Sequence, residues 1–280
     1  MNFSTVDLAR ALQFGDEGDW LTMAEHLNAL LEGCPKDAHV LCWLGVAEHE
    51  LGMDGAAYER FRACLATEPT DPQLLTMAGN GLARFDDPAA ESVLRTATLL
   101  DPNLASARTF YGAYLAREGM SKEALKELEA AVALAPDGAE TLTEWGVALA
   151  LAGRLEEAVD AFYQACGAGP EDGWARALVG LTLVMLGRTA DALTDLLQAA
   201  DLRPDDVEIA LVASLVAAAC DEPDRAYEMV ERARMRAITG DLPLVDEVLD
   251  RVEEGRAPSK VFLKEEIVSG AFRERLMTRP

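Results

Sequence analysis

The stretch LTEWGVALALAGRLEEAVDAFYQACGAGP, residues 142–170, carries most of what this 280-residue chain reveals about its fold. Small residues interrupt its apolar runs at wide intervals, with Gly146, Gly153 and Ala158 inside the stretch and Pro170 at its end. The stretch contains no Ser-His-Asp set, no Cys-x-x-Cys pair and no phosphate-binding loop. Regular small residues without reactive groups among them indicate helix packing rather than chemistry.

The same arrangement recurs along the chain with a period of 33 or 34 residues. One glycine series is Gly45, Gly79, Gly112, Gly146 and Gly180, and a second is Gly52, Gly119, Gly153 and Gly187. The alanine series is Ala57, Ala124, Ala158 and Ala192. The prolines that close the units are Pro35, Pro69, Pro102, Pro136, Pro170 and Pro204. Because four series share one period, the sequence indicates an array of repeats.

Each repeat has the pattern of two helices joined by a tight turn. Asp137 with Glu140 predicts a capping box at the start of the first helix. Gly153 predicts the end of that helix, where a left-handed residue is needed. We expect Gly146 and Ala158 to be small because the two helices cross there, so that stacked helix pairs bury a continuous core.

The pattern resembles the tetratricopeptide repeat (TPR) family, whose 34-residue signature matches WLGVAEHELGMDGAAYERFRACLATEP (43–69) and EWGVALALAGRLEEAVDAFYQACGAGP (144–170). The resemblance implies an all-α α-solenoid, a right-handed superhelix of about seven TPR-like helical hairpins with C-terminal capping helices. The units would begin near residues 4, 38, 72, 105, 139, 173 and 207. Residues 1–240 would form the repeat array, and residues 241–280 a capping helix and an amphipathic tail.

The resemblance is strong from 38 to 206 and weaker at both ends. Ala11 replaces the crossing glycine of the first unit. In the seventh unit, Ser214 and Asp221 stand at the glycine positions and Ile238 stands at the proline position. Atypical end units are expected of caps. The third unit is one residue short at ARFDDPAAES (83–92), where Asp86 or Asp87 would cap a helix that begins at a proline.

The tail differs from the repeats in pattern and in charge. DLPLVDEVLDRVEEG (241–255) predicts one helix, RAPS (256–259) predicts a break, and residues 260–280 predict an amphipathic helix interrupted at Ser269-Gly270. Basic residues outnumber acids in 260–280, whereas the chain as a whole has a formal net charge of −24. This contrast motivates the hypothesis that the tail docks into the acidic groove of its own chain or of a neighbouring copy, which includes self-association through the tail.

Charge and composition exclude several classes of function. An acidic chain with a pI of about 4.4 repels phosphate backbones, so we expect no nucleic-acid partner. The longest apolar run, Ile209 to Cys220, is too short to insert into a membrane, which takes about 20 residues. The N-terminus has no signal-peptide pattern, and five unpatterned cysteines suit a reducing compartment. We predict a cytoplasmic protein, and its Ala-, Leu- and Arg-rich style is typical of a GC-rich bacterial genome.

The resemblance also implies where a partner would bind, because in the family the first helix of each unit lines a concave groove. The positions carried over by frame are His39, Cys42, Trp43, Val46, His49, Gln73, Thr76, Met77, Asn80, Thr109, Phe110, Ala113, Glu140, Thr143, Trp174, Ala177 and Leu181. Trp43 and Trp174 are candidate anchors for a peptide, with packing between neighbouring helices as the alternative. The groove positions offer almost no Lys or Arg, which argues against a ligand with a terminal carboxylate. We expect an apolar or basic segment instead.

Residues 34–49 need a separate test for metal binding and catalysis. His49 is seven residues beyond Cys42, about 10 Å along a helix, which is too far to share one ion. Cys34, His39 and Cys42 supply three ligands at most. A Cys42–His39 nucleophilic pair has no evident orienting acid or oxyanion donor. We therefore predict no metal, no cofactor and no catalytic residue.

These inferences favour a non-catalytic interaction scaffold or adaptor that binds a peptide segment or helix of a partner in its groove. Two alternatives stay open. One is a bacterial secretion- or assembly-type TPR chaperone, and the other is a regulatory subunit or domain of an enzyme.

Overall fold

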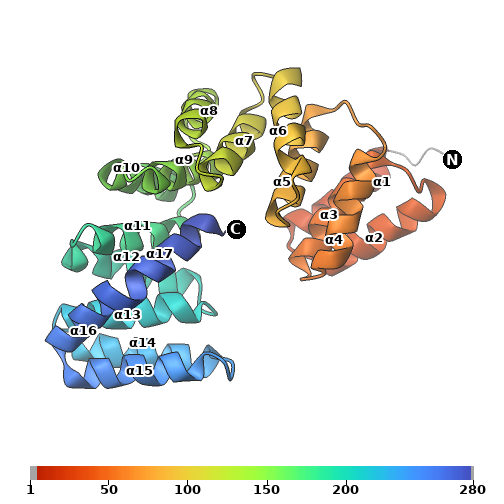
Figure 1. Ribbon diagram of the computed structural model, residues 1–280. Helices are drawn as coiled ribbons and strands as arrows, with labels where there is room; N and C mark the ends of the chain where they lie inside the picture. Colours follow the sequence, from red (N-terminus) through yellow and green to blue (C-terminus); the bar gives the residue numbers. More distant parts are fainter. Residues whose placement is uncertain (1–4, 279–280) are drawn as a thin grey trace. The chain divides into compact units, whose positions relative to one another are not determined.

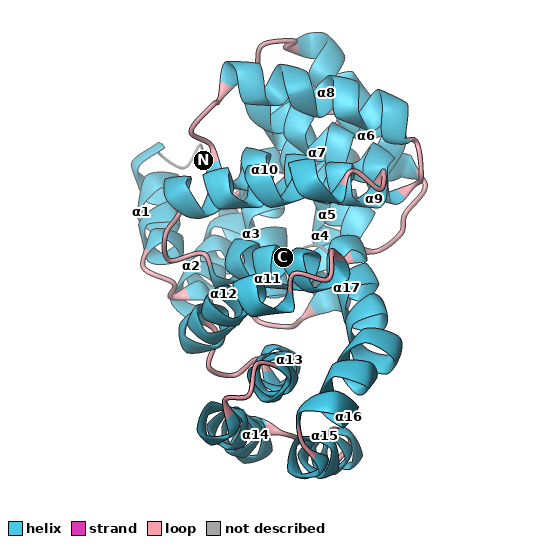
Figure 2. Ribbon diagram, turned by 90° about the vertical axis from the view of Figure 1, so that its left-hand side faces the viewer, coloured by secondary structure: helices cyan, strands magenta, loops and turns pink. Residues whose placement is uncertain are grey.

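A computed structural model describes the backbone of residues 5–278 and the side chains of residues 7–278, so the predicted start of the first unit near residue 4 lies outside the described residues. Throughout this range the regular structure is helical (Figures 1 and 2), which confirms the predicted all-α solenoid class. The helices are α1 (Thr5–Asp16), α2 (Trp20–Gly33), α3 (Ala38–Glu50), α4 (Asp54–Leu65), α5 (Pro72–Arg84), α6 (Ala89–Leu100), α7 (Ala105–Arg117), α8 (Ser121–Leu134), α9 (Ala139–Leu151), α10 (Leu155–Ala168), α11 (Gly173–Met185), α12 (Thr189–Leu202), α13 (Val207–Ala219), α14 (Pro223–Arg236), α15 (Leu242–Glu254), α16 (Arg256–Phe262), the π-helix η1 (Leu263–Ile267) and α17 (Val268–Met277). In the described part, no helix is both long enough and apolar enough to cross a lipid bilayer.

The chain divides into two compact units, Met1–Tyr114 and Leu115–Pro280, with the boundary inside α7. In the N-terminal unit, apolar side chains of α1–α3 pack around Met23 and Leu27. Those of α3–α6 pack around Phe61. In the C-terminal unit, one core of buried side chains extends from α9 to α17. Each unit is thus stabilised by apolar contacts between successive helices.

Glycines on the first helices allow close crossing of the hairpins. A Cβ atom at Gly146 would lie 2.5 Å from Cδ1 of Phe162, and one at Gly180 would lie 2.4 Å from Cγ of Leu196. In both hairpins the facing residue comes sixteen positions after the glycine, whereas in the short third unit Gly79 faces Leu94, fifteen positions later. The prediction that Gly146 is small because two helices cross there is confirmed.

The first helices end in left-handed turns. Gly153 has a φ of +77°, and the Arg154 backbone N–H donates to the Leu149 carbonyl at 2.9 Å. Asp86 and Asp221 adopt the same conformation, with φ of +52° and +67°. Because aspartate tolerates the left-handed region better than most residues, the turn geometry is kept in the hairpins that lack this glycine.

Aspartates cap several first helices. Asp37, Asp172 and Asp206 each accept a backbone hydrogen bond from the first turn of α3, α11 or α13. The predicted capping box at Asp137 is wrong, since Gly138 occupies the N-cap of α9 and makes no side-chain hydrogen bond. In the third unit Pro88 occupies the N-cap of α6, and the Asp87 Oδ1 just before it accepts from the Ala89 N–H at 2.8 Å.

The cap of α11 gives a first prediction. Asp172 accepts from the backbone N–H groups of Trp174 and Ala175 at 2.9 and 3.2 Å. Asp172→Ala leaves both groups without this acceptor, so it is expected to lower the free energy of unfolding by about 1 kcal/mol. Urea unfolding followed by circular dichroism measures the change. The control is Glu171→Ala, which alters the exposed neighbour outside the cap; an equal loss in both variants would contradict the assignment.

The C-terminal segment is helical, but its turn and its irregular stretch lie at other residues than the sequence predicts. The predicted break across RAPS is wrong: the chain turns at Gly255, whose φ is +97°, and α16 begins at once with Pro258 in its first turn. Proline is tolerated there because first-turn N–H groups have no partner within the helix. The predicted interruption at Ser269-Gly270 is also wrong, since both residues lie inside α17 and the irregular turn is η1.

Candidate functional site

In the C-terminal unit, the first helices α9, α11 and α13 are covered by the chain's own C-terminal segment. α16 and η1 pack against α13, and α17 packs against α11 and α9 (Figures 1 and 2). We call the surface that this segment covers, formed by residues 139–151, 173–185 and 206–219, the inner face. α13 is buried at every residue from Ile209 to Ala219, which explains why this part of its sequence is almost entirely apolar.

Arg275 of α17 anchors the tail to the inner face. Its Nη2 donates to Asp206 Oδ1 at 2.7 Å, and its Nε and Nη2 donate to Glu208 Oε2 at 3.0 and 2.8 Å. The same guanidinium lies 5.2 Å from the ring centroid of Trp174, and the guanidinium of Arg203 lies 5.6 Å from that centroid. The Arg275 side chain is 7% exposed. One buried cation from the tail therefore meets two carboxylates and an indole.

Burial and the guanidinium act in opposite directions on these carboxylates. Burial alone would raise the pKa of Asp206, but the hydrogen bond and charge of Arg275, with the Ile209 N–H bond, bring it below its usual value. For Glu208, burial exceeds the effect of Arg275 and raises the pKa. The pKa of Arg275 is raised by both carboxylates against the opposing effect of burial. Asp206 is thus the carboxylate whose ionised form the surroundings favour most.

This arrangement predicts a pH dependence. A depressed folded-state pKa stabilises the fold above the unfolded value, near pH 4 for Asp, and the contribution is lost as pH falls through the folded-state pKa. Asp206→Asn keeps an N-cap residue but removes the titrating charge. We expect the stability difference between wild type and Asp206→Asn to be larger at pH 7 than at pH 3, as measured by urea unfolding. Equal differences at both pH values would contradict it.

A second buried ion pair lies beside the end of the tail. Arg117 Nη1 donates to Glu144 Oε2 at 2.7 Å and Nη2 to Oε1 at 3.1 Å, and the two side chains are 4% and 7% exposed. Arg117 Nη2 also donates to the backbone carbonyl of Thr278 at 3.2 Å. Arg117, beside the inner face, therefore holds the end of the tail through the backbone of Thr278.

In the N-terminal unit, the first helices α3 and α5 carry a polar network, to which Asp54 at the start of α4 also contributes. His49 Nε2 lies 2.8 Å from Arg84 Nη1, and His49 Nδ1 lies 3.0 Å from Asp54 Oδ1. Because arginine is always a donor, Nε2 is the acceptor and Nδ1 carries the proton that Asp54 accepts. The imidazole also makes an edge contact with Phe85, at 6.1 Å between centroids. His49 is thereby fixed in one tautomer and one orientation.

The structure separates the predicted binding residues by exposure. The following are buried and present no open surface: Cys42, Thr76, Thr109, Ala113, Thr143, Trp174, Ala177 and Leu181. Cys42 packs between α3 and α5, with its Sγ 3.9 Å from the Leu74 carbonyl. Trp174, Ala177 and Leu181 belong to α11, which is packed against α17. These positions contribute to packing here, and Trp174 also contacts the tail.

The other predicted positions remain accessible in part or in full. Half-buried ones are His39, Trp43, Val46, His49, Met77, Asn80 and Phe110, and exposed ones are Gln73 and Glu140. Trp43 packs against the core of α1–α3. Val46 and Met77 pack against the neighbouring core. A role in binding remains a prediction for all of them.

Sequence spacing alone does not single out Asp206, Arg117 and Arg275 as site residues. Asp206 was recognisable as a helix start, and Arg275 as one of several basic tail residues. Their pairing joins residues 69 positions apart, which no local spacing reveals. The opposite charges of tail and repeats were the one available signal.

Cys42 and His39 both make contacts within the fold. A hydrogen bond with the Cys64 thiol, together with burial, raises the pKa of Cys42, which opposes thiolate formation. His39 Nε2 lies 4.0 Å from Asp71 Oδ2. Across the described residues, no group of three His, Cys, Asp or Glu side chains is placed to hold a metal ion.

Comparison with solved structures places this geometry among known folds. The chain is similar to a chain in the crystal structure of the APC/C hetero-tetramer Cut9-Hcn1, with a TM-score of 0.71 and 17% identity over 89% of this chain; it spans 49% of that chain. It is similar to a tetratricopeptide repeat protein from Parabacteroides merdae (TM-score 0.61, 15% identity, 88% of this chain and 97% of that one). It is also similar to a thermophilic TPR protein in Thermus thermophilus (TM-score 0.54, 24% identity, 64% and 97%). No protein-family model and no curated protein matches the chain.

Proposed function

Since the chain has the fold of a tetratricopeptide repeat protein, we propose that it is a non-catalytic interaction scaffold that holds a helix or peptide segment of a partner on its first helices. The observation that carries this proposal is the C-terminal unit, where α9, α11 and α13 already bind a helix. A surface that holds α17 through ion pairs, an indole and apolar contacts is suited to holding a similar segment of another protein.

The chemistry of both units favours a basic or apolar segment. The inner face supplies the carboxylates of Asp206 and Glu208 to a cation. In the N-terminal unit, Gln73, Met77 and Asn80 lie along one side of α5 at helical spacing and are exposed or half-buried. The net charge of −24 would draw a basic partner over longer distances. We further propose that residues 1–240 serve as the binding array and 241–280 as its cap and tail.

Photocrosslinking of the full chain tests the proposed function. p-Benzoylphenylalanine placed at Gln73, on the first helix of the third hairpin, is compared with the same residue at Glu91, an exposed position of the second helix. In extract of the native cells we expect a covalent adduct with one partner from position 73 and none from position 91. Adducts of equal yield from both positions, or none from either, would argue against a binding face on the first helices.

A further inference from the structure

We propose that the inner face is a receptor for one class of ligand, an amphipathic helix with an arginine between apolar residues, and that α17 is a resident ligand that such a partner helix displaces. This inference rests on the proposed function and specifies the partner and the regulation of the C-terminal unit. It follows from the pattern on α17, from the groups that meet it, and from the way in which α17 is joined to the rest of the chain.

The buried side chains of α17 define the ligand pattern. They are Val268, Ala271, Phe272, Arg275 and Leu276. Their spacing of three, four, seven and eight residues from Val268 places them on one face of the helix. Arg273 and Glu274 on the opposite side are exposed. A partner helix of the form apolar-x-x-small-aromatic-x-x-Arg-Leu would present the same face.

The inner face is selective for the arginine of this pattern. Asp206 and Glu208 accept three hydrogen bonds from the Arg275 guanidinium, and Trp174 lies against it. An ammonium group has no planar fork and would match these acceptors less well. A neutral residue at this position would leave the partly buried Glu208 without its cation and Asp206 with Arg203 alone, at 3.4 Å, which is costly. The site therefore discriminates by the cation, while the apolar residues fill the core beside it.

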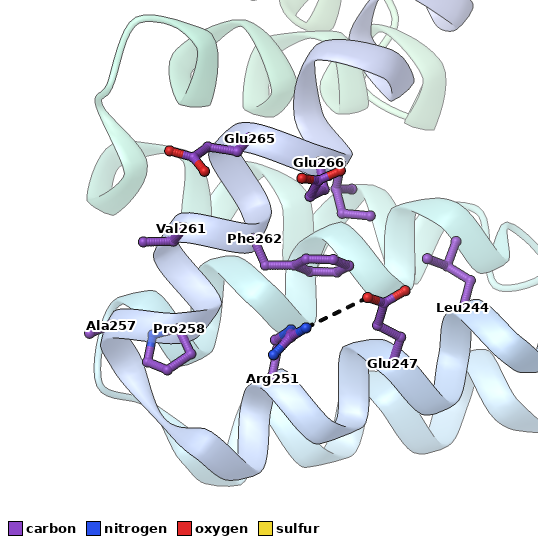
Figure 3. A pocket seen from close by; sticks show the side chains of 10 residues that line it. Leu244, Glu247, Arg251, Ala257, Pro258, Val261, Phe262, Glu265 and Glu266 are labelled. Atoms are coloured by element: carbon purple, nitrogen blue, oxygen red, sulfur yellow. Dashed lines mark ion pairs between the residues drawn. The ribbon is translucent and has the colours of Figure 1, made fainter.

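α16 and α17 are held to the chain very differently. The Ser259 hydroxyl donates a hydrogen bond to the Arg251 carbonyl at 2.8 Å, and the Arg251 guanidinium lies 5.4 Å from the Phe262 ring centroid. Figure 3 shows Phe262 above Arg251, with the Arg251–Glu247 ion pair beside it. These contacts fasten α16 to α15, so the start of the tail remains in place when its end moves.

The junction between the two helices is weak. η1 is a π-helical turn, a rare conformation that often marks functional positions. Glu265, Glu266 and Ile267 of this turn line an open cavity of about 710 Å³ between α15 and α16 (Figure 3). α17 itself has ten residues and an internal glycine, so it is too short to be stable as a helix once it leaves the inner face. The fold thus permits undocking of α17 alone.

The fraction of molecules with α17 docked on the inner face determines the apparent affinity of that face for a partner helix. The apparent dissociation constant equals the intrinsic constant divided by the undocked fraction. A short tether holds α17 at an effective concentration in the millimolar range, which favours the docked state. If about nine of ten molecules are docked, undocking the tail lowers the apparent constant about tenfold.

The test measures binding of a fluorescein-labelled peptide with the sequence of residues 264–280 to the full chain by anisotropy. Arg275→Glu is expected to undock α17 by repulsion from Asp206 and Glu208, so peptide binding should tighten about tenfold or more relative to wild type. Arg273→Glu is the matched control, because it makes the same charge change on the exposed side of α17. A peptide that carries the Arg275→Glu change should not bind. Hydrogen exchange of residues 268–277 should accelerate in Arg275→Glu and not in the control.

A second variant distinguishes undocking of α17 from misfolding caused by the Arg275→Glu change. Gly270→Pro leaves Arg275 intact. Because η1 and α17 are continuous, with the Val268 N–H donating to the Leu263 carbonyl, residue 270 lies inside a helical run rather than in a first turn. Proline there should break the run and give the same gain in peptide affinity. Equal affinity of wild type, Arg275→Glu and Gly270→Pro for the peptide would overturn the inference, as would rapid exchange of residues 268–277 in wild type. Failure here leaves the crosslinking result at Gln73 unaffected, so the inference and the proposed function fail by separate measurements.

Discussion

Asp195→Ala is expected to lower the free energy of unfolding of the C-terminal unit by about 3–5 kcal/mol. Asp195 accepts from Arg176 Nη1 at 3.1 Å and from the Tyr163 hydroxyl at 2.9 Å. The side chains of Arg176 and Asp195 are 15% and 10% exposed. Removing the carboxylate leaves a guanidinium in the interior without its counter-ion, and its Nε already has no hydrogen-bond partner among the described residues. Urea unfolding followed by circular dichroism measures the loss.

A matched control lies on the same helix. Asp191 pairs with Arg188 at 2.8 Å, but both side chains are about half exposed, so Asp191→Ala is expected to change stability little. A second readout is Tyr163, whose pKa is raised to about 12 first by burial and then by its hydrogen bond to Asp195. Asp195→Ala should lower this pKa towards its ordinary value, because it removes the hydrogen bond and the negative charge. A loss of stability no larger than that of Asp191→Ala would refute the assignment.

Gly146→Leu is expected to lower the free energy of unfolding by about 3 kcal/mol, because it overfills the crossing of α9 and α10. Even the first added atom would lie 2.5 Å from two ring carbons of Phe162, a side chain that is fully buried. Neither helix can retreat without breaking contacts with its other neighbours. Thermal and urea unfolding of the variant measure the effect.

Gly167→Leu is the control for this substitution. Gly167 lies in α10, is exposed, and has no atom within 4 Å of an added Cβ in the described structure. The change is expected to be neutral or slightly stabilising, because glycine is a poor helix former. A further check combines Gly146→Ala with Phe162→Leu, which should lose less than the sum of the two single changes. Strict additivity would show that the two positions do not share the crossing.

The architecture was predictable because its determinants are local and repeated. Within one hairpin, Gly146 marks the helix crossing and Gly153 marks the left-handed turn. The 34-residue period predicts the same two features in the neighbouring units. The missing residue of the third unit even appears as the shift from sixteen to fifteen positions between Gly79 and Leu94. Helix starts were less predictable, as the absent capping box at Asp137 shows.

The candidate site was harder to predict because a position in a repeat does not determine what covers it. Cys42 and Thr76 occupy groove positions by frame, yet both are buried. Ala177 and Leu181 belong to a helix against which α17 packs. The pairing of Arg275 with Asp206 depends on the path of the tail after Gly255, and the break across RAPS that the sequence suggested would have directed the chain elsewhere. Tertiary contacts of this kind have no signature in helical spacing.

The closeness of the Trp174 ring to the guanidinium groups of Arg203 and Arg275 has a practical consequence. The emission of an indole depends on nearby charge and on water, and the departure of α17 would change both at this ring. Undocking of α17, as proposed, would therefore change the emission of Trp174, one of four tryptophans in the chain, and would report tail occupancy without a label.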